Sequence, residues 1–341
     1  MRGLSNLSNK KRAKILLPAL LIVLFAGLIW SINIGFTPLA IDRILATMFG
    51  FGDTTETFII WQLRIPRTVV AIFVGACLAA AGAVMQGVTR NPLATPSMIG
   101  VSSGAGFGIL IVVYLYDKGL PMLLPYPIAA IIGAFCVFGL VYGLAVRHNL
   151  SPTKLILNGI AVNSCIGAVS LLLTSRLSAD AYLMLTLSQA GNLTYATWKM
   201  IFIGFGIALP CFIYIFYRTF CLNILNLDDE MAVGLGLNLK KERRVLLYIT
   251  IILTSASVYV AGTIGFVGLI APHIAKRLVG SNFKLFLPLS MCFGAGLVMF
   301  ADIMAKILVN DINKALYVPV GITIAILGAP YLLYLLYAQD R

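Results

Sequence analysis

The sequence predicts an all-α polytopic membrane protein with about ten transmembrane helices. Of its 341 residues, 60% are hydrophobic and 11% are charged, whereas a soluble protein of this size carries about a quarter charged residues. Apolar runs long enough to cross a bilayer recur along the whole chain. The net charge is +13 despite this apolarity, and cytoplasmic loops of membrane proteins carry such an excess of Lys and Arg. These three observations exclude a soluble enzyme.

Other composition features exclude further classes. The basic residues are scattered between apolar runs, which argues against a nucleic-acid-binding domain. The six cysteines form no C-x-x-C pair, and the two histidines, His148 and His273, lie far apart. We therefore expect neither a disulfide framework nor a metal site in this chain.

The ten predicted spans leave no room for a soluble domain, so residues 1–341 are expected to form a single transmembrane domain. The first span follows a basic segment, residues 1–14, and lacks a cleavage site, so it is expected to be a retained helix after a cytoplasmic N-terminus. The eighth span is short and is interrupted by glycines and a proline. The spans are 15–34, 68–88, 98–116, 121–145, 153–174, 198–220, 243–261, 263–278, 285–308 and 319–337.

The distribution of basic residues predicts the orientation. With the N-terminus inside and ten alternating spans, 17 of the 25 Lys and Arg residues fall inside and eight fall outside. This excess predicts a multi-pass protein with both termini in the cytoplasm. The eight exceptions are Arg43, Arg64, Arg67, Lys118, Arg176, Lys199, Lys306 and Lys314.

Between the first two spans, Thr37 is expected to cap a helix that has Pro38 at its first position and Gly50 beyond its end. Its apolar residues share one face, which fits either an amphipathic helix on the outer membrane surface or a packed loop helix. Small residues spaced four apart, such as Gly104 and Gly108, and a similar stripe around Gly82 predict close helix packing.

At the outer mouth of the second span, Arg64 and Arg67 flank Ile65-Pro66 and oppose the inside-positive trend. They fit snorkelling to lipid phosphates or docking of an acidic protein surface, because a guanidinium binds carboxylates with two parallel hydrogen bonds. At the inner end of the same span, Arg90-Asn91-Pro92 and Pro96 interrupt the helix. That segment fits either a plain turn or irregular backbone lining a cavity.

The cytoplasmic loop 221–244 is expected to contain two short helices. Its acidic residues favour a helix start, its glycines a helix end, and Asn238 a second cap. Such a loop fits a handle for a partner protein, or a solvated loop with anchoring charges. The acidic residues are Asp228, Asp229 and Glu230, and the glycines are Gly234 and Gly236.

Asp302 and Lys306 lie four residues apart in the ninth span and are expected to pair on one helix face. Intramembrane ionisable residues are functional candidates, so one hypothesis is an ion-coupled secondary transporter that uses this pair. The chain has no G-x-x-x-x-G-K-[ST] phosphate loop and no cluster typical of an enzyme site, so it is not expected to be an enzyme.

Taken together, the motifs resemble the FecCD-type permeases, the membrane subunits of ABC importers for iron-siderophores, haem and cobalamin. The resemblance runs from about Trp61 to Tyr337. The motifs that carry it are Arg64-x-Pro66-Arg67, Gln86 with Arg90-Asn91-Pro92-Leu93-Ala94-x-Pro96, Gly265-Phe266-Val267-Gly268-Leu269 with Pro272-His273, Ala301-Asp302 and Pro319-Val320-Gly321.

The resemblance implies a cobalamin-importer-like permease fold in a bacterial cytoplasmic membrane. It implies a second permease subunit, two ATPase subunits that bind ATP and Mg²⁺, and an external substrate-binding protein, with no cofactor in this chain. The implied cargo is a metal chelate, first of all an Fe(III)-siderophore. The resemblance thus makes an ABC importer permease the leading prediction, and the ion-coupled secondary transporter is the alternative.

The resemblance also implies residue roles. Arg64 and Arg67 match arginines that dock the binding protein, and Lys306 stands where a third arginine is usual. Asn91 and Leu93 match the inner gate, which Thr153 is expected to face. Residues 227–244 are similar to the coupling helices that contact the ATPase. Two positions depart from the family pattern, with Ser188 in place of a common tryptophan and Tyr317 in place of a usual glutamate.

Overall fold

The computed structural model describes residues 8–35, 37, 39–122, 124–146, 152–312 and 318–339. Throughout these ranges every regular element is a helix, so the predicted all-α class is confirmed. Tyr317 and His148 lie outside the described residues. The helices are α1 (Asn9–Asn33), α2 (Ile41–Met48), α3 (Thr54–Phe58), η1 (Ile59–Arg64), α4 (Ile65–Thr89), η2 (Pro96–Ile99), α5 (Val101–Asp117), α6 (Tyr126–Val146), α7 (Pro152–Thr174), α8 (Ala179–Gln189), α9 (Trp198–Tyr217), α10 (Thr219–Leu225), α11 (Asp229–Gly234), α12 (Leu239–Ala261), α13 (Val267–Val279), α14 (Phe283–Ile312) and α15 (Val320–Gln339).

The ten predicted spans correspond in order to α1, α4, α5, α6, α7, α9, α12, α13, α14 and α15. Seven helices of the described chain are long and apolar enough to cross a bilayer, and α5 and α15 contribute shorter apolar helices. The eighth span, α13, has 13 residues, or about 20 Å of helix against a hydrocarbon core of about 30 Å. The segment 262–266 before it is not helical.

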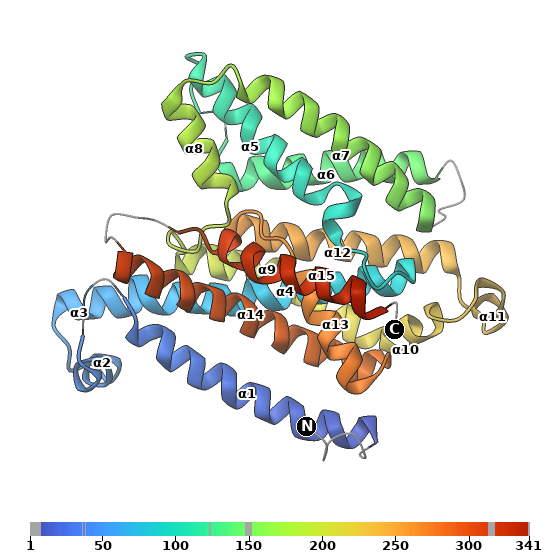
Figure 1. Cartoon of the computed structure of the whole chain (residues 1–341), viewed down its shortest axis with the longest axis horizontal. Helices are drawn as coiled ribbons and strands as arrows, with labels where there is room; N and C mark the ends of the chain where they lie inside the picture. The colour runs from blue at the N-terminus through green and yellow to red at the C-terminus, as the bar shows by residue number, and fades with distance from the viewer. Residues whose placement is uncertain are drawn as a thin grey trace.

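The bundle is built around α4, most of whose residues are buried. It packs against α14, α12 and α13, and α1 lies along the outer side of α14 (Figure 1). The pair α5–α6, with α7 and α8, forms a second layer above this core in the same view. The buried length of α4 is rich in Ala and Gly, which lets neighbouring helices approach its backbone.

Two glycine contacts explain the stripes of small residues. A Cβ on Gly82 would clash with the backbone of Gly268 in α13, and a Cβ on Gly104 would clash with the backbone of Gly133 in α6. The predicted close packing is therefore confirmed at both stripes.

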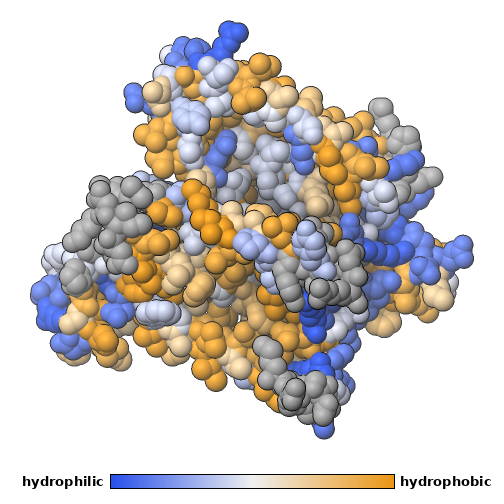
Figure 2. All heavy atoms as spheres, in the orientation of Figure 1, coloured by the Kyte–Doolittle hydropathy of each residue, from blue (hydrophilic) through white to orange (hydrophobic). Residues whose placement is uncertain are grey.

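Polar side chains gather at two opposite ends of the bundle, and an apolar band lies between them (Figure 2). One end carries α11 and the other carries α2, and we name them the α11 end and the α2 end (Figure 1). The start of α1 lies at the α11 end, where Asn9 approaches Gly280 after α13. The last turns of α15 point toward the same end (Figure 1).

Three local predictions need correction. The helix between the first two spans begins at Ile41, not at Pro38, which lies outside the described residues. The carbonyl of Thr37, the expected cap, instead accepts a hydrogen bond from Arg64. Helix α8 was not predicted, although Ser178 caps it by accepting a hydrogen bond from the amide of Ala181. The third correction concerns the α11 loop and is described with the site.

The exposure of α2 separates the two hypotheses for this helix. Ile44 is buried, but Ile41, Leu45 and Phe49 are 63%, 51% and 78% exposed. A helix with large apolar side chains facing outward fits the membrane surface better than a packed loop.

Candidate functional site

The loop 221–244, which contains α11 and which we name the α11 loop, forms largely as predicted. Asp228 is the N-cap of α11, which ends at Gly234, and Gly236 has a φ of +83°. The Oδ1 of Asn238 accepts a hydrogen bond from the amide of Lys241 at 3.1 Å and so caps the next helix. That next helix is α12 itself, which continues for 23 residues. The prediction of two short helices is therefore wrong in its second part, because Asn238 starts a membrane span.

Asp229 joins α11 to two other elements. Its Oδ1 accepts hydrogen bonds from Arg90 Nη2 at 2.5 Å and from Arg243 Nη2 at 2.7 Å, and its Oδ2 accepts one from Arg243 Nη1 at 3.1 Å. Burial alone would raise the pKa of Asp229, but the hydrogen bonds and charges of Arg243 and Arg90 outweigh it and lower that pKa. The carboxylate is thus held ionised between two guanidinium groups.

Arg90 ends α4 in an unusual conformation. Its φ is +52°, in the left-handed region where glycine is the usual residue at a helix end. Its Nε donates to the carbonyl of Leu225, the last residue of α10, at 2.7 Å. Arg90 therefore contacts both α10 and α11 from the end of α4.

The predicted gate residues Asn91 and Leu93 lie in the turn directly after Arg90. The Oδ1 of Asn91 accepts a hydrogen bond from the amide of Leu93 at 2.9 Å, and its carbonyl accepts one from Ala94 at 3.1 Å. Asn91 and Leu93 are half-buried. Thr153 is exposed near the start of α7.

The segment after the turn is braced from α7 at another position. The Nδ2 of Asn163 donates to the carbonyls of Ser97 and Met98, and its Oδ1 accepts from Ser103 at 2.5 Å. Gly159 lets α7 pack directly on the backbone at Met98. Gly159 and Asn163 therefore join α7 to η2, and neither residue lies in a motif that the sequence predicts to be functional.

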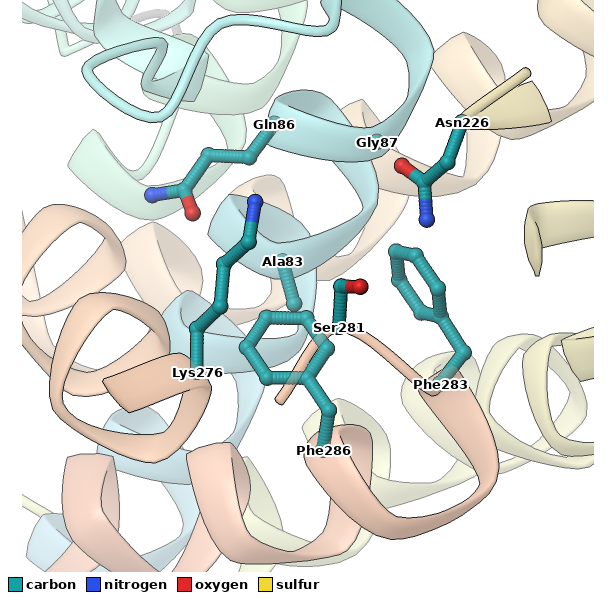
Figure 3. Close-up of a pocket in the computed structure, with 8 residues that line it drawn as sticks. All are labelled: Ala83, Gln86, Gly87, Asn226, Lys276, Ser281, Phe283 and Phe286. Atoms are coloured by element: carbon teal, nitrogen blue, oxygen red, sulfur yellow. The ribbon is translucent and has the colours of Figure 1, made fainter. Parts of the chain in front are cut away.

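A small cavity of about 10 Å³ lies between α4, α13 and α14, a volume that suits about one water molecule. Gln86 and Lys276 extend side by side at its edge, and the rings of Phe283 and Phe286 lie opposite (Figure 3). The Nε2 of Gln86 donates to the carbonyl of Gly268 at 3.4 Å. This bond joins the motif that begins at Gln86 to the motif Gly265-Phe266-Val267-Gly268-Leu269.

At the α2 end, Asp302 holds two cations. Its Oδ1 lies 2.8 Å from Arg67 Nε, and its Oδ2 lies 2.8 Å from Lys306 Nζ. The Asp302 side chain is fully buried, and those of Arg67 and Lys306 are 13% and 7% exposed. The predicted pairing of Asp302 with Lys306 is confirmed, and Arg67 joins it from α4.

The other docking candidates also turn inward. Lys306 Nζ donates to the Oγ of Ser31 at 2.9 Å and so binds α14 to α1. Arg64 is 6% exposed; its Nη1 donates to the carbonyl of Ile32 at 2.8 Å, and its Nη2 donates to that of Thr37. A cation at these positions stabilises the C-terminal carbonyls of α1.

The structure therefore assembles two polar centres. At the α11 end it brings together Arg90, Asp229 and Arg243, and at the α2 end Arg67, Asp302 and Lys306. Asp228 and Glu230 lie beside Asp229 at the start of α11 and are exposed. In the described part of the chain, no group of three His, Cys, Asp or Glu side chains is placed to hold a metal ion.

Comparison with known proteins agrees with this architecture. The chain is 32% identical over 311 residues to the iron(3+)-hydroxamate import system permease protein FhuG of Bacillus subtilis, covering 90% of this chain and 91% of the relative. It is 34% identical to the Fe(3+)-citrate import system permease protein YfmE of B. subtilis and 32% identical to the hemin transport system permease protein HmuU of Yersinia pestis, with 98% of both chains covered in each case.

A solved structure described as a metal-chelate type ABC transporter, in an inward-facing conformation, matches with a TM-score of 0.84 at 29% identity. The match covers 95% of this chain and 99% of that one. A model of the FecCD transport family matches residues 20–338. The chain is thus a multi-pass membrane protein that belongs to the FecCD transport family.

Proposed function

We propose that this chain is the membrane-spanning permease subunit of an ABC importer that carries a metal chelate, with an Fe(III)-siderophore as the first candidate. Its relatives support this class of cargo, because they are named as permeases for the import of Fe(III) hydroxamates, Fe(III) citrate and hemin. The chain supplies the path, and separate ATPase subunits supply ATP hydrolysis with bound Mg²⁺. Its surroundings are a bacterial cytoplasmic membrane, with both termini and the α11 end inside.

The exposed face of α11 carries this proposal. Met231 and Val233 on the six-residue helix α11, and Leu235 directly after it, are 61%, 57% and 62% exposed outside the apolar band. Large apolar side chains on a polar end of a protein are a surface that a partner covers. Because α11 is also anchored to α4 and α12 through Asp229, a force on this face reaches the membrane helices.

The remaining partners are the ones that membership of the family implies. A second permease subunit, either a copy or a related chain, faces the first across the pathway, with Asn91, Leu93 and Thr153 at the inner gate. An external binding protein docks at the α2 end. Arg67 is the first candidate for this contact, because its side chain is 13% exposed while Arg64 and Lys306 are 6% and 7–8% exposed. It also pairs with Asp302 and donates to Thr194 at 3.2 Å.

The alternative of an ion-coupled transporter rested on Asp302 and Lys306. The Asp302 carboxylate is already paired with two cations, the buried Lys306 and the largely covered Arg67, so we assign this centre as a structural clamp in the importer. The two functions differ in their energy source. An importer stops when the ATPase is absent, whereas an ion-coupled transporter stops with a proton uncoupler.

The test is reconstitution of the chain with its cognate ATPase subunits and binding protein in proteoliposomes. Uptake of ⁵⁵Fe(III)-hydroxamate, ⁵⁵Fe(III)-citrate and haemin is measured with and without ATP. We expect ATP-dependent uptake of at least one chelate, and uptake that survives removal of the ATPase would refute the proposal. The variant Met231→Asp should release the ATPase during purification, while Tyr195→Asp, at an exposed aromatic residue outside α11, should keep it bound.

A further inference from the structure

The end of α4 carries an arginine where the backbone favours glycine. Among the described residues, Arg90 and Phe266 are the non-glycine residues with positive φ. The left-handed conformation is unfavourable for a residue with a Cβ, so glycine would suit this helix end better. The retained side chain must therefore contribute something that glycine cannot.

The guanidinium of Arg90 bridges two elements of the α11 end. Its Nε donates to the Leu225 carbonyl at 2.7 Å and its Nη2 to Asp229 at 2.5 Å. Leu225 ends α10, and Asp229 is the first residue of α11. One planar group with donors on two sides thus holds the connection between α10 and α11 against the end of α4.

The carboxylate of Asp229 is also fixed from the other side. Arg243 is 7% exposed and donates two hydrogen bonds to it from the first turns of α12. A two-point contact with a buried guanidinium fixes the orientation of Asp229. Any displacement of α11 therefore changes the Arg90 contact, the Arg243 contact, or both.

Arg90 is covalently next to the turn that leads to η2. The Asn91 side chain closes that turn on the amide of Leu93, and Asn163 holds the following carbonyls of Ser97 and Met98. A turn closed by hydrogen bonds moves as a unit. A pull on the Arg90 side chain is thereby passed on to residues 91–99.

We propose that Arg90 is a positioning residue that transmits movement of α11 to the segment 91–99. The Asp229 carboxylate pulls on the guanidinium, and the backbone after Arg90 follows. This inference rests on the proposed function, in which the ATPase moves α11. Without the Arg90 side chain, ATP hydrolysis would continue but the segment would no longer follow it.

The test measures movement of the segment directly and needs no transported ligand. Ser97→Cys, at an exposed position of η2, is introduced into the chain assembled with its ATPase. Its rate of labelling by a maleimide is compared without nucleotide and with ATP, Mg²⁺ and vanadate. Labelling at position 97 is quantified by peptide mass spectrometry, so the native cysteines do not interfere.

With Arg90 present, we expect the two labelling rates to differ. With Arg90→Gly, the ratio of the rates should fall to about one while ATP hydrolysis persists. Movement of α11 then has no side-chain contact through which it could favour one arrangement of the segment 91–99 over another. Glycine also accepts the left-handed conformation, which offsets part of the stability lost with the two Arg90 hydrogen bonds, so Arg90→Gly should lower the unfolding temperature less than Asp229→Asn, which also weakens the Arg243 contacts. A complete loss of coupling with only a small loss of stability separates transmission from a structural role.

Further variants sharpen the test. Asp229→Asn should reduce the ratio as Arg90→Gly does, and the double variant should reduce it no further than either single one, because both remove the Arg90–Asp229 contact. Arg90→Lys should give an intermediate ratio, since a lysine reaches one acceptor. Arg90→Asn, which also tolerates positive φ, replaces the glycine variant if that variant does not assemble. Arg43→Ala, at an exposed ion pair near the α2 end, is the matched control.

Two results would overturn the inference: a parent complex that hydrolyses ATP with equal labelling rates, or an Arg90→Gly complex that keeps the parent ratio. Failure of the proposed function looks different, because the parent chain would then not bind the ATPase at all.

Discussion

Arg67 and Asp302 lie 235 positions apart in the sequence, yet Arg67 Nε and Asp302 Oδ1 are 2.8 Å apart in the folded chain. The contact joins α4 to α14 at the α2 end, and Lys306 occupies the second oxygen of the same carboxylate. One buried anion between two cations leaves net positive charge at this end. The centre therefore joins α4 and α14, and the Arg67 side chain within it remains 13% exposed.

Removing the Asp302 carboxylate should destabilise the protein. In Asp302→Asn, two buried cations lose their counter-charge, which costs about 3–5 kcal/mol for a buried pair. Thermal unfolding in detergent should show a clear decrease in Tm, and adding Lys306→Met should recover part of it because one unpaired cation is gone. Asp53→Asn, at a carboxylate that is 77% exposed, is the control and should change Tm little. An unchanged Tm in Asp302→Asn would contradict the clamp.

Arg64→Ala should loosen the end of α1. The guanidinium donates to the carbonyls of Ile32, Asn33 and Thr37, and alanine leaves these acceptors without it. Hydrogen exchange should increase in the last turn of α1 and stay unchanged in α12. If exchange is unchanged but the external binding protein no longer binds, Arg64 acts in docking and the anchoring role is refuted.

Arg67→Lys tests docking with the charge retained. Lysine can still pair with Asp302 but loses the planar fork for a partner carboxylate. We expect the affinity for the external binding protein to fall about tenfold, the equivalent of one hydrogen bond to a charged group. Titration of the binding protein onto the chain in nanodiscs measures this, and an unchanged affinity would remove Arg67 from the docking surface.

Gly82→Ala should destabilise the protein clearly, although it adds only one methyl group. The added methyl group meets the backbone of Gly268, which cannot rotate away, so α4 and α13 must separate. Overpacking of this kind costs about 1–3 kcal/mol. Gly139→Ala in α6, where a Cβ meets no atom within 4 Å, is the matched control and should be neutral or stabilising. Equal unfolding temperatures for the two variants would argue against tight packing at Gly82.

The anchoring of α11 should depend on pH in one direction. The pKa of Asp229 is lower in the folded chain than its ordinary value of about 3.9, so its stabilising contribution is fully present above that value. The contribution is lost as the pH falls through the lowered pKa. The difference in Tm between the parent and Asp229→Asn should therefore be constant from about pH 5 to 8 and shrink below about pH 4. A difference in Tm that grows as the pH falls would contradict the lowered pKa of Asp229.

Local chemistry predicted the elements of the fold well. The ten spans, the start of α11 after Asp228 and the cap at Asn238 all depend on residues close in sequence. The error at Asn238 shows the limit of this approach. A cap identifies where a helix starts, but the length of the helix depends on the apolar residues that follow, and here they continue into a membrane span.

The polar centres were only partly predictable. The pair Asp302–Lys306 could be predicted because four residues make one helical turn, whereas the contacts of Asp302 with Arg67 and of Asp229 with Arg90 join residues from distant spans. The inward direction of Arg64 was equally hidden, because it depends on where α1 ends. Tertiary packing decides these contacts, and a single sequence carries no local sign of them.

The shortness of α13 has a consequence for hydration. Its 13 residues leave about a third of the bilayer core uncrossed, and residues 262–266 make up the difference as irregular backbone. Free amides and carbonyls are not tolerated in contact with lipid tails. Part of this demand is met inside the chain, because the Gly262 amide donates to the Val258 carbonyl at 2.9 Å and the Gly265 carbonyl accepts from the Val267 amide at 2.8 Å. The backbone of residues 262–266 must therefore face protein or water, so lipid is excluded from the side of the bundle where the helix is missing.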